Sequence, residues 1–215
     1  MNAQEILNYL ELLANNSLWV NFSMHVLALM ALISVFMVTK EYLKRWVFQG
    51  TVSILFLSVA INAFIFGNPF HMVTFSLLAI TALVQLFVGK ENIRIAESRW
   101  ITAIALSFIL IGLWYPEFVD KNALMLLVVS PVGVIPCPTL LTTIGLLMLI
   151  MPSVSRFQYV ITIIMGIVYG VIGVFVFKVY LDITLLILVL YASWIYFRSS
   201  SQAKTKTVLC SQLEG

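Results

Sequence analysis

Long apolar stretches alternate with short polar ones along most of the chain. A helix needs about 20 apolar residues to cross the hydrocarbon of a membrane, and seven stretches approach that length. They run roughly over residues 18–39, 46–66, 70–89, 100–116, 123–151, 157–177 and 181–197. The pattern predicts an all-α fold, a polytopic transmembrane helix bundle of about seven spans over residues 18–197.

The two ends of the chain depart from this pattern. Apolar residues recur at helical spacing between Ile6 and Ala14, so residues 1–17 are predicted to form a short amphipathic helix on the membrane surface. Residues 198–215 are polar and have little to bury, which is typical of a flexible segment. We expect them to form a cytoplasmic tail.

The fifth stretch, 123–151, is too long and too rich in proline for one regular helix. As a straight helix it would measure about 43 Å, against a hydrocarbon core of about 30 Å. It contains Pro131, Gly133, Pro136 and Pro138. One interpretation is a broken helix that still crosses the membrane, and the other is a re-entrant hairpin that returns to the same side. We favour the broken fifth helix, because of the charge distribution.

Basic residues gather on one side of the predicted bundle. Ten of the twelve follow the first, third, fifth or seventh stretch, and these are Lys40, Lys44, Arg45, Lys90, Arg94, Arg99, Arg156, Arg198, Lys204 and Lys206. A hairpin at the fifth stretch would reduce this ten-to-two asymmetry to seven against five. Since cytoplasmic loops collect Lys and Arg, we expect the N-terminus outside and the C-terminus inside.

Composition supports the membrane interpretation. Hydrophobic residues make up 62% of the chain and charged residues 10%, whereas soluble domains are about half apolar and a quarter charged. We therefore expect the lipid bilayer as the main partner and the bacterial inner membrane as the location. The net charge of +3 is small and lies in short loops, so no nucleic-acid partner is predicted.

The segment Ser130-Pro131-Val132-Gly133-Val134-Ile135-Pro136-Cys137-Pro138-Thr139 is the most unusual part of the sequence. Each proline lacks an N–H and crowds the carbonyl four residues earlier, and unpaired backbone groups are not tolerated in lipid. Transporters use such broken helices as substrate sites. The predicted substrate-binding residues are Ser130, Pro131, Gly133, Pro136, Cys137, Pro138 and Thr139. The alternative, weighed equally, is a kinked helix whose freed carbonyls pair with a neighbouring helix.

The Pro136-Cys137-Pro138-Thr139 segment followed by Gly145-Leu146-Leu147 resembles the signature of an uncharacterised family of small bacterial membrane proteins. In that family a glycine and a membrane-edge aspartate follow, compatible with Gly170 and Asp182. The family implies a polytopic membrane fold and no assigned activity. The Pro-Cys-Pro piece is also similar to a motif of nickel and cobalt efflux permeases, although Thr139 stands where those proteins tend to have glycine.

The two histidines, His25 and His71, each have a methionine neighbour. Imidazole and thiolate suit soft metal ions, so His25, His71 and Cys137 form a candidate metal-ligand set. Imidazole also ligates haem iron, and the chain's cofactor is unknown from the sequence. The plainer interpretation, which we favour, is an interfacial His71 and a His25 bonded to a neighbouring helix.

Gly166 and Gly170 form a GxxxG pair that Gly173 extends. Small residues let helix backbones approach closely in lipid. We favour packing within the chain over a homo-oligomer contact.

These observations lead to two functional hypotheses. The first is a transporter or channel for a small solute or metal ion, with its site in the broken helix at 130–139. The second is a structural, sensory or haem-binding membrane subunit. No serine–histidine–acid set, phosphate-binding glycine loop or CxxC pair occurs, so we do not expect an enzyme.

Overall fold

The computed structural model describes residues 3–89 and 92–213, and every regular element within them is helical. The helices are α1 (Ala3–Asn16), α2 (Leu18–Met37), α3 (Glu41–Ile65), α4 (Pro69–Val88), α5 (Arg99–Leu113), α6 (Ala123–Val129), α7 (Pro136–Leu149), α8 (Arg156–Val171) and α9 (Ile183–Leu213). A π-helical turn, η1 (Ile172–Val176), and a 3-10 turn, η2 (Tyr180–Asp182), join α8 to α9. The predicted all-α fold is confirmed.

Five helical segments are long and apolar enough to cross a membrane. They are α2, α3, α4, the continuous helix Arg156–Val176 and the segment Tyr180–Ser199. The apolar helices α5 and α7 have 15 and 14 residues, or roughly 21–23 Å at 1.5 Å per residue. The structure therefore supports membrane insertion with five long spans. Helix length alone does not support the predicted seven spans.

The outward faces of these helices are strongly apolar. Large exposed hydrophobic side chains occur on each of them, for example Ile33, Phe64, Phe87, Ile164 and Leu190. Apolar surface on this scale is unfavourable in water and favourable in lipid. The exposed faces thus agree with the five long helices as lipid-facing elements.

Helix α7 lies at the centre of the bundle. Every residue from Pro138 to Leu149 is buried, and α7 contacts α2, α3, α5, α8 and α9. A helix enclosed in this way touches protein on all sides, so its length need not match the membrane. The break at its N-terminal end is therefore held by neighbouring helices.

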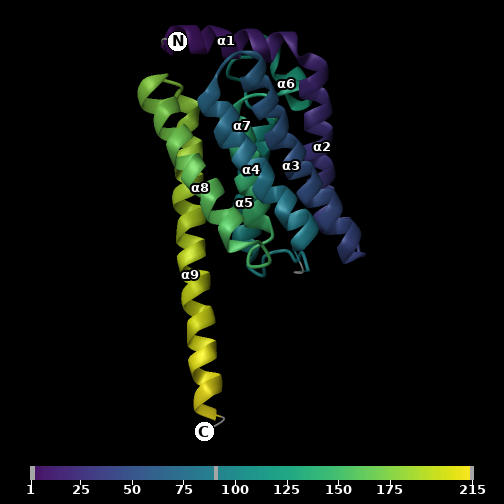
Figure 1. Cartoon of the computed structure of the whole chain (residues 1–215), viewed down its shortest axis with the longest axis vertical. Helices are drawn as coiled ribbons and strands as arrows, with labels where there is room; N and C mark the ends of the chain where they lie inside the picture. The colour runs from purple at the N-terminus through teal and green to yellow at the C-terminus, as the bar shows by residue number, and fades with distance from the viewer. Residues whose placement is uncertain (1–2, 90–91, 214–215) are drawn as a thin grey trace.

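Helix α1 lies across one end of the bundle, near α6 (Figure 1). Leu10, Leu13 and Ala14 are buried there, in a small cluster with residues of the break such as Val134 and Ile135. Burial raises the pKa of Tyr9 to about 12, so its hydroxyl stays protonated and donates to the Asn62 carbonyl at 3.5 Å. The helix is confirmed, and its position on a membrane surface stays a prediction.

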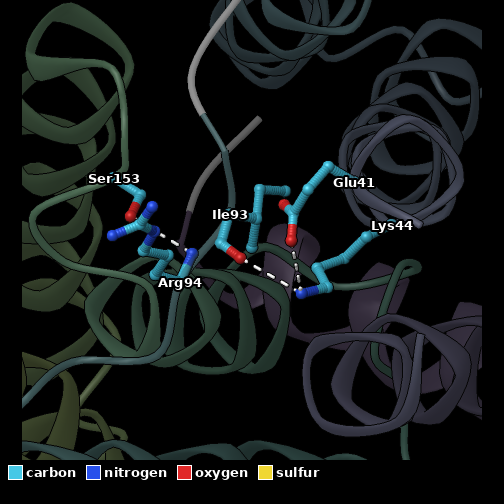
Figure 2. Close-up of polar contacts among 5 residues, drawn as sticks. All are labelled: Glu41, Lys44, Ile93, Arg94 and Ser153. Carbon is cyan, nitrogen blue, oxygen red and sulfur yellow. Dashed lines mark hydrogen bonds and ion pairs between the residues drawn. The ribbon is translucent and has the colours of Figure 1, made fainter. Parts of the chain in front are cut away.

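At the opposite end, the connection between α4 and α5 is tied to the bundle by polar contacts (Figure 2). Lys44 donates to the Glu41 carboxylate and to the Ile93 carbonyl, both at 3.2 Å. The Arg94 N–H donates to the Ser153 hydroxyl at 3.2 Å. Two of the basic residues that set the predicted orientation thus belong to a structured end of the bundle.

Some predictions reach beyond the described residues. Lys90, one of the ten basic residues, lies outside them, as do residues 1–2 of the N-terminal helix and 214–215 of the tail. The backbone of α9 continues as a helix to Leu213 and extends past the other helices (Figure 1). The predicted flexibility and cytoplasmic location of 198–215 stay predictions.

The glycines of α8 face α9, and the glycine of η1 faces η2. A Cβ on Gly166 would meet Val189, and one on Gly170 would meet Leu186. One on Gly173 would overlap the carboxylate of Asp182. The prediction that these glycines pack within the chain is therefore confirmed. A homo-oligomer stays a prediction.

Candidate functional site

The fifth apolar stretch is interrupted as predicted. Helix α6 ends at Val129, α7 begins at Pro136, and residues 130–135 between them are not helical. The Pro131 carbonyl accepts from the N–H groups of Val134 (3.1 Å) and Ile135 (2.9 Å), which closes a tight turn. Gly133 has a φ of +75°, a conformation that glycine adopts without strain. The break is thus a defined turn between two half-helices.

Thr139 satisfies backbone groups that this break frees, and Ser130 ties the break to the end of α5. The Ser130 hydroxyl donates to the Gly112 carbonyl at 3.1 Å and accepts from the Tyr115 N–H at 3.2 Å. The Thr139 hydroxyl donates to the Ile135 carbonyl at 2.6 Å and accepts from the Gly133 N–H at 2.7 Å. Both side chains are fully buried. Their hydroxyls stabilise the break. The sequence predicted both residues as substrate-binding residues and gave no sign of this structural role.

The prolines of the motif reduce the number of unpaired donors at a buried helix start. A helix leaves its first four N–H groups without intrahelical partners. Here Ile135 donates to Pro131, whereas Pro136 and Pro138 have no N–H at all. Two of the first three residues of α7 therefore bring no donor that would need a partner.

A small cavity opens beside this helix start. Its polar lining consists of His71, Cys137, Tyr169 and Asp182, and its apolar lining includes Leu10, Ile135, Pro136 and Phe177. It offers about 20 Å³ to the centre of a water molecule, enough for one water. Cys137 therefore faces a cavity between helices, as predicted. Of the seven predicted substrate-binding residues, Pro136 and Cys137 line it, and Ser130, Pro131, Gly133, Pro138 and Thr139 do not.

Asp182 brings a carboxylate into this cavity. It is 2% exposed and accepts a hydrogen bond of 2.5 Å from the buried Tyr115 hydroxyl. The Cys137 thiol lines the same cavity as this carboxylate. Ionisable side chains inside a membrane bundle are rare and usually functional. The cavity thus combines a thiol and a carboxylate at the helix break.

His71 reaches the cavity from the start of α4. Asn68 caps this helix by accepting from the His71 N–H at 3.2 Å, and Pro69 occupies its first position. The His71 Nδ1 lies 3.0 Å from the Tyr169 hydroxyl, which in turn lies 2.8 Å from the Thr74 hydroxyl. This chain of contacts orients the imidazole at the cavity wall.

The second histidine lies elsewhere. His25 is buried on α2 and does not line the cavity, and its Nδ1 has no hydrogen-bond partner. Within 3–89 and 92–213, no three His, Cys, Asp or Glu side chains are placed to hold a metal ion. The cavity brings two of the three candidate metal ligands together, His71 and Cys137, and leaves out His25.

Sequence reasoning missed three members of this site. Tyr115 and Tyr169 gave no signal beyond their position near the ends of apolar stretches. Asp182 did give one, because the sequence places a lone acidic residue at the start of the last apolar stretch. The structure buries Asp182 against Gly173, and its position at the membrane edge stays a prediction.

The chain was compared with protein-family models, curated proteins and solved structures. No protein-family model, curated protein or solved structure matches this chain. The site must therefore be interpreted from its own geometry.

We predict that Ser130→Ala destabilises the bundle. The substitution leaves the Tyr115 N–H and the Gly112 carbonyl buried without their partner, at about 1–3 kcal/mol for each group. Unfolding of the purified protein by increasing denaturing detergent would measure this loss. Ser107→Ala is the matched control, because Ser107 is exposed and bonds only within its own helix. Equal stability of the two variants would contradict the bracing role of Ser130.

Proposed function

We propose that this chain is an integral membrane protein that binds a small solute or metal ion at the broken fifth span and carries it across the membrane. The single observation behind this proposal is the cavity at the break, which is lined by Cys137, Asp182 and His71. Half-helices that meet at a polar cavity are the architecture of many transporter sites.

The proposed topology has seven spans. The short helices α5 and α7 count as the fourth span and as part of the fifth, because the rest of the bundle encloses or flanks them. The N-terminus is then outside and the C-terminus in the cytoplasm, which places the cavity near the outer face. The basic residues of the opposite end agree with this orientation.

Solute transport has more support than the haem-binding alternative. The cavity as it stands has room for about one water molecule, and His25 and His71 do not meet at it. Haem would need a far larger space between the helices. We propose that the cavity is the closed state of a site that widens when a small solute or ion enters.

Reporter fusions test the topology. Because Lys and Arg gather beside these positions, fusions after residues 43, 95 and 204 should all report the cytoplasm. A fusion after residue 120 should report the outside and serves as the control. Opposite results at 95 and 204 would show that the fifth stretch returns to its own side.

Protection of Cys137 tests the site. In a Cys210→Ser background, a membrane-permeant maleimide should label Cys137 slowly, because the thiol lies in a narrow cavity. Ni²⁺, Co²⁺ and Cu⁺ are the first probes, since the Pro-Cys-Pro segment is similar to nickel and cobalt permeases, and a panel of small organic solutes follows. At least one probe should slow labelling several-fold and enter proteoliposomes that contain the protein.

A control thiol keeps this test specific. Ser23→Cys, placed in a Cys137→Ser, Cys210→Ser background, lies on the exposed face of α2 and should react at one rate whatever is added. Should every probe leave Cys137 labelling unchanged and fail to enter the vesicles, the transport proposal is wrong.

A further inference from the structure

A second and much larger hollow lies next to the buried cavity, at the end of the bundle that α1 crosses (Figure 1). This hollow, the α1 groove, is formed by α1, the loop 116–120 and the turn 177–179. It is open and offers about 520 Å³ to the centre of a water molecule, against about 20 Å³ in the buried cavity. Its polar lining consists of Gln4, Asn8, Glu11, Glu117, Asp120 and Lys178. The α1 groove is therefore a space for water beside the closed site.

Three apolar side chains separate the two hollows. Phe118, Phe177 and Val179 line both the α1 groove and the buried cavity. A side chain that lines two hollows stands between them, so the wall is one side chain thick where these residues lie. Val179 is buried, whereas the two phenylalanines are partly exposed. An occupant that moves from the α1 groove to the buried cavity would have to displace these rings.

The backbone of this wall is strained on both of its sides. Phe118 has a φ of +70°, and Lys178, between Phe177 and Val179, has a φ of +58°. A positive φ is uncommon outside glycine, and for a bulky residue it is an outlier. Residues held in this way gather at ligand clamps and switch regions. The contacts around the wall thus hold both segments in conformations that a movement of the wall would relieve.

Helix α1 supplies the contacts that hold the Phe118 segment. The Asn15 side-chain amide donates to the Phe118 carbonyl at 2.9 Å, and its oxygen accepts from the Asp120 N–H at 3.0 Å. The Phe118 ring packs against the main core and also against the small cluster beneath α1. Asn15 therefore fixes the loop to α1 and keeps the Phe118 ring in the wall.

We propose that Phe118 and Phe177 form the gate between the α1 groove and the buried cavity, and that Asn15 keeps this gate closed. When Asn15 releases the loop 116–120, the Phe118 ring leaves the wall and a small occupant reaches Cys137. Movements of loops that open and close a site in this way are common. The gate itself is defined by the two hollows, whereas its use for uptake rests on the proposed transport function.

The rate at which a water-soluble thiol reagent reaches Cys137 tests the gate. A charged methanethiosulfonate would be added to the full-length Cys210→Ser protein in lipid nanodiscs. Phe118→Ala and Phe177→Ala should each raise the labelling rate at least about tenfold, which corresponds to an opening that is easier by about 1.4 kcal/mol. Phe175→Ala is the matched control, because Phe175 is an exposed aromatic residue that lines neither hollow. Its labelling rate should equal that of the parent protein.

Asn15→Ala tests the same gate without removing a ring from the wall. It should raise the labelling rate of Cys137 several-fold, because the loop loses two hydrogen bonds. Asn8→Ala is its control, since the Asn8 side chain accepts from Gln4 within α1, and should leave the rate unchanged.

A buried reporter thiol separates gate opening from loss of the fold. Ser53→Cys, in a Cys137→Ser, Cys210→Ser background, replaces a side chain that is 3% exposed and lines neither hollow. It should stay unreactive when combined with Phe118→Ala, Phe177→Ala or Asn15→Ala.

Two results would overturn the gate. One is a Cys137 labelling rate that none of the three variants raises, and the other is a rate that rises only together with that of Ser53→Cys. Faster labelling in the gate variants, with no probe that protects Cys137 or enters vesicles, would support the gate and overturn solute transport. Protection of Cys137 by a probe, with one labelling rate in all variants, would overturn the gate alone.

Discussion

Gly173→Ala should destabilise the protein and disrupt the site at the same time. The added methyl group would overlap the Asp182 carboxylate and lie 2.7 Å from its Cγ. Asp182 would have to move, which would break the 2.5 Å hydrogen bond from Tyr115. Overpacking of this kind lowers the free energy of unfolding by about 1–3 kcal/mol. We also expect faster labelling of Cys137, because its carboxylate neighbour is displaced.

Gly50→Ala is the matched control for this substitution. Gly50 lies in the interior of α3, and a Cβ there would meet nothing within 4 Å. Replacing a helix-interior glycine by alanine usually raises stability by about 0.5–1 kcal/mol. Detergent-induced unfolding and the rate of maleimide labelling would be measured on both variants. Equal behaviour of the two would mean that the contact between Gly173 and Asp182 does not hold the carboxylate in place.

The long helices could be predicted from hydropathy because each apolar run ends at polar or helix-breaking residues. The predicted stretches 18–39, 46–66 and 70–89 correspond to α2 (Leu18–Met37), α3 (Glu41–Ile65) and α4 (Pro69–Val88). The largest difference is at the start of α3, which extends through the basic residues Lys44 and Arg45. A helix can continue into the polar membrane boundary, where composition no longer marks its end.

The interruption of the fifth stretch could also be predicted, because proline acts locally. Its extent could not. We expected the break to run to Thr139, whereas α7 begins at Pro136. Pro136 and Pro138 occupy the first turn of α7, where a missing N–H removes a donor that had no partner. The same residue type therefore breaks a helix at Pro131 and starts one at Pro136.

The polar site could be predicted only in part, because tertiary structure brings it together. Cys137 stood out through its motif, and His71 through its rarity. Asp182 lies at the end of an apolar stretch, and such a residue usually contacts water. The π-helical turn at 172–176 and the 3-10 turn at 180–182 fold it inward instead. No local sequence pattern predicts such a pair of turns.

Asp182→Asn should separate stability from function. Asparagine keeps the shape of the side chain and one acceptor oxygen for Tyr115, but it removes a buried charge that has no cationic partner. Relief of such a charge should leave the free energy of unfolding unchanged or raise it by about 0.5–2 kcal/mol, as expected where a site trades stability for function. If the probe that protects Cys137 is a cation, its protection should fall at least about tenfold, which corresponds to about 1.4 kcal/mol.

The matched control is Asp120→Asn, which removes the same charge from an exposed position in the loop before α6. It should leave both the unfolding midpoint and Cys137 protection at their wild-type values. Detergent-induced unfolding and maleimide labelling with and without that probe, measured on the same preparations, give both quantities. If Asp182→Asn unfolds far more easily than the wild type, the carboxylate anchors η2 and the end of α8 as part of the fold. If it keeps full protection, binding of the probe does not depend on the charge of Asp182.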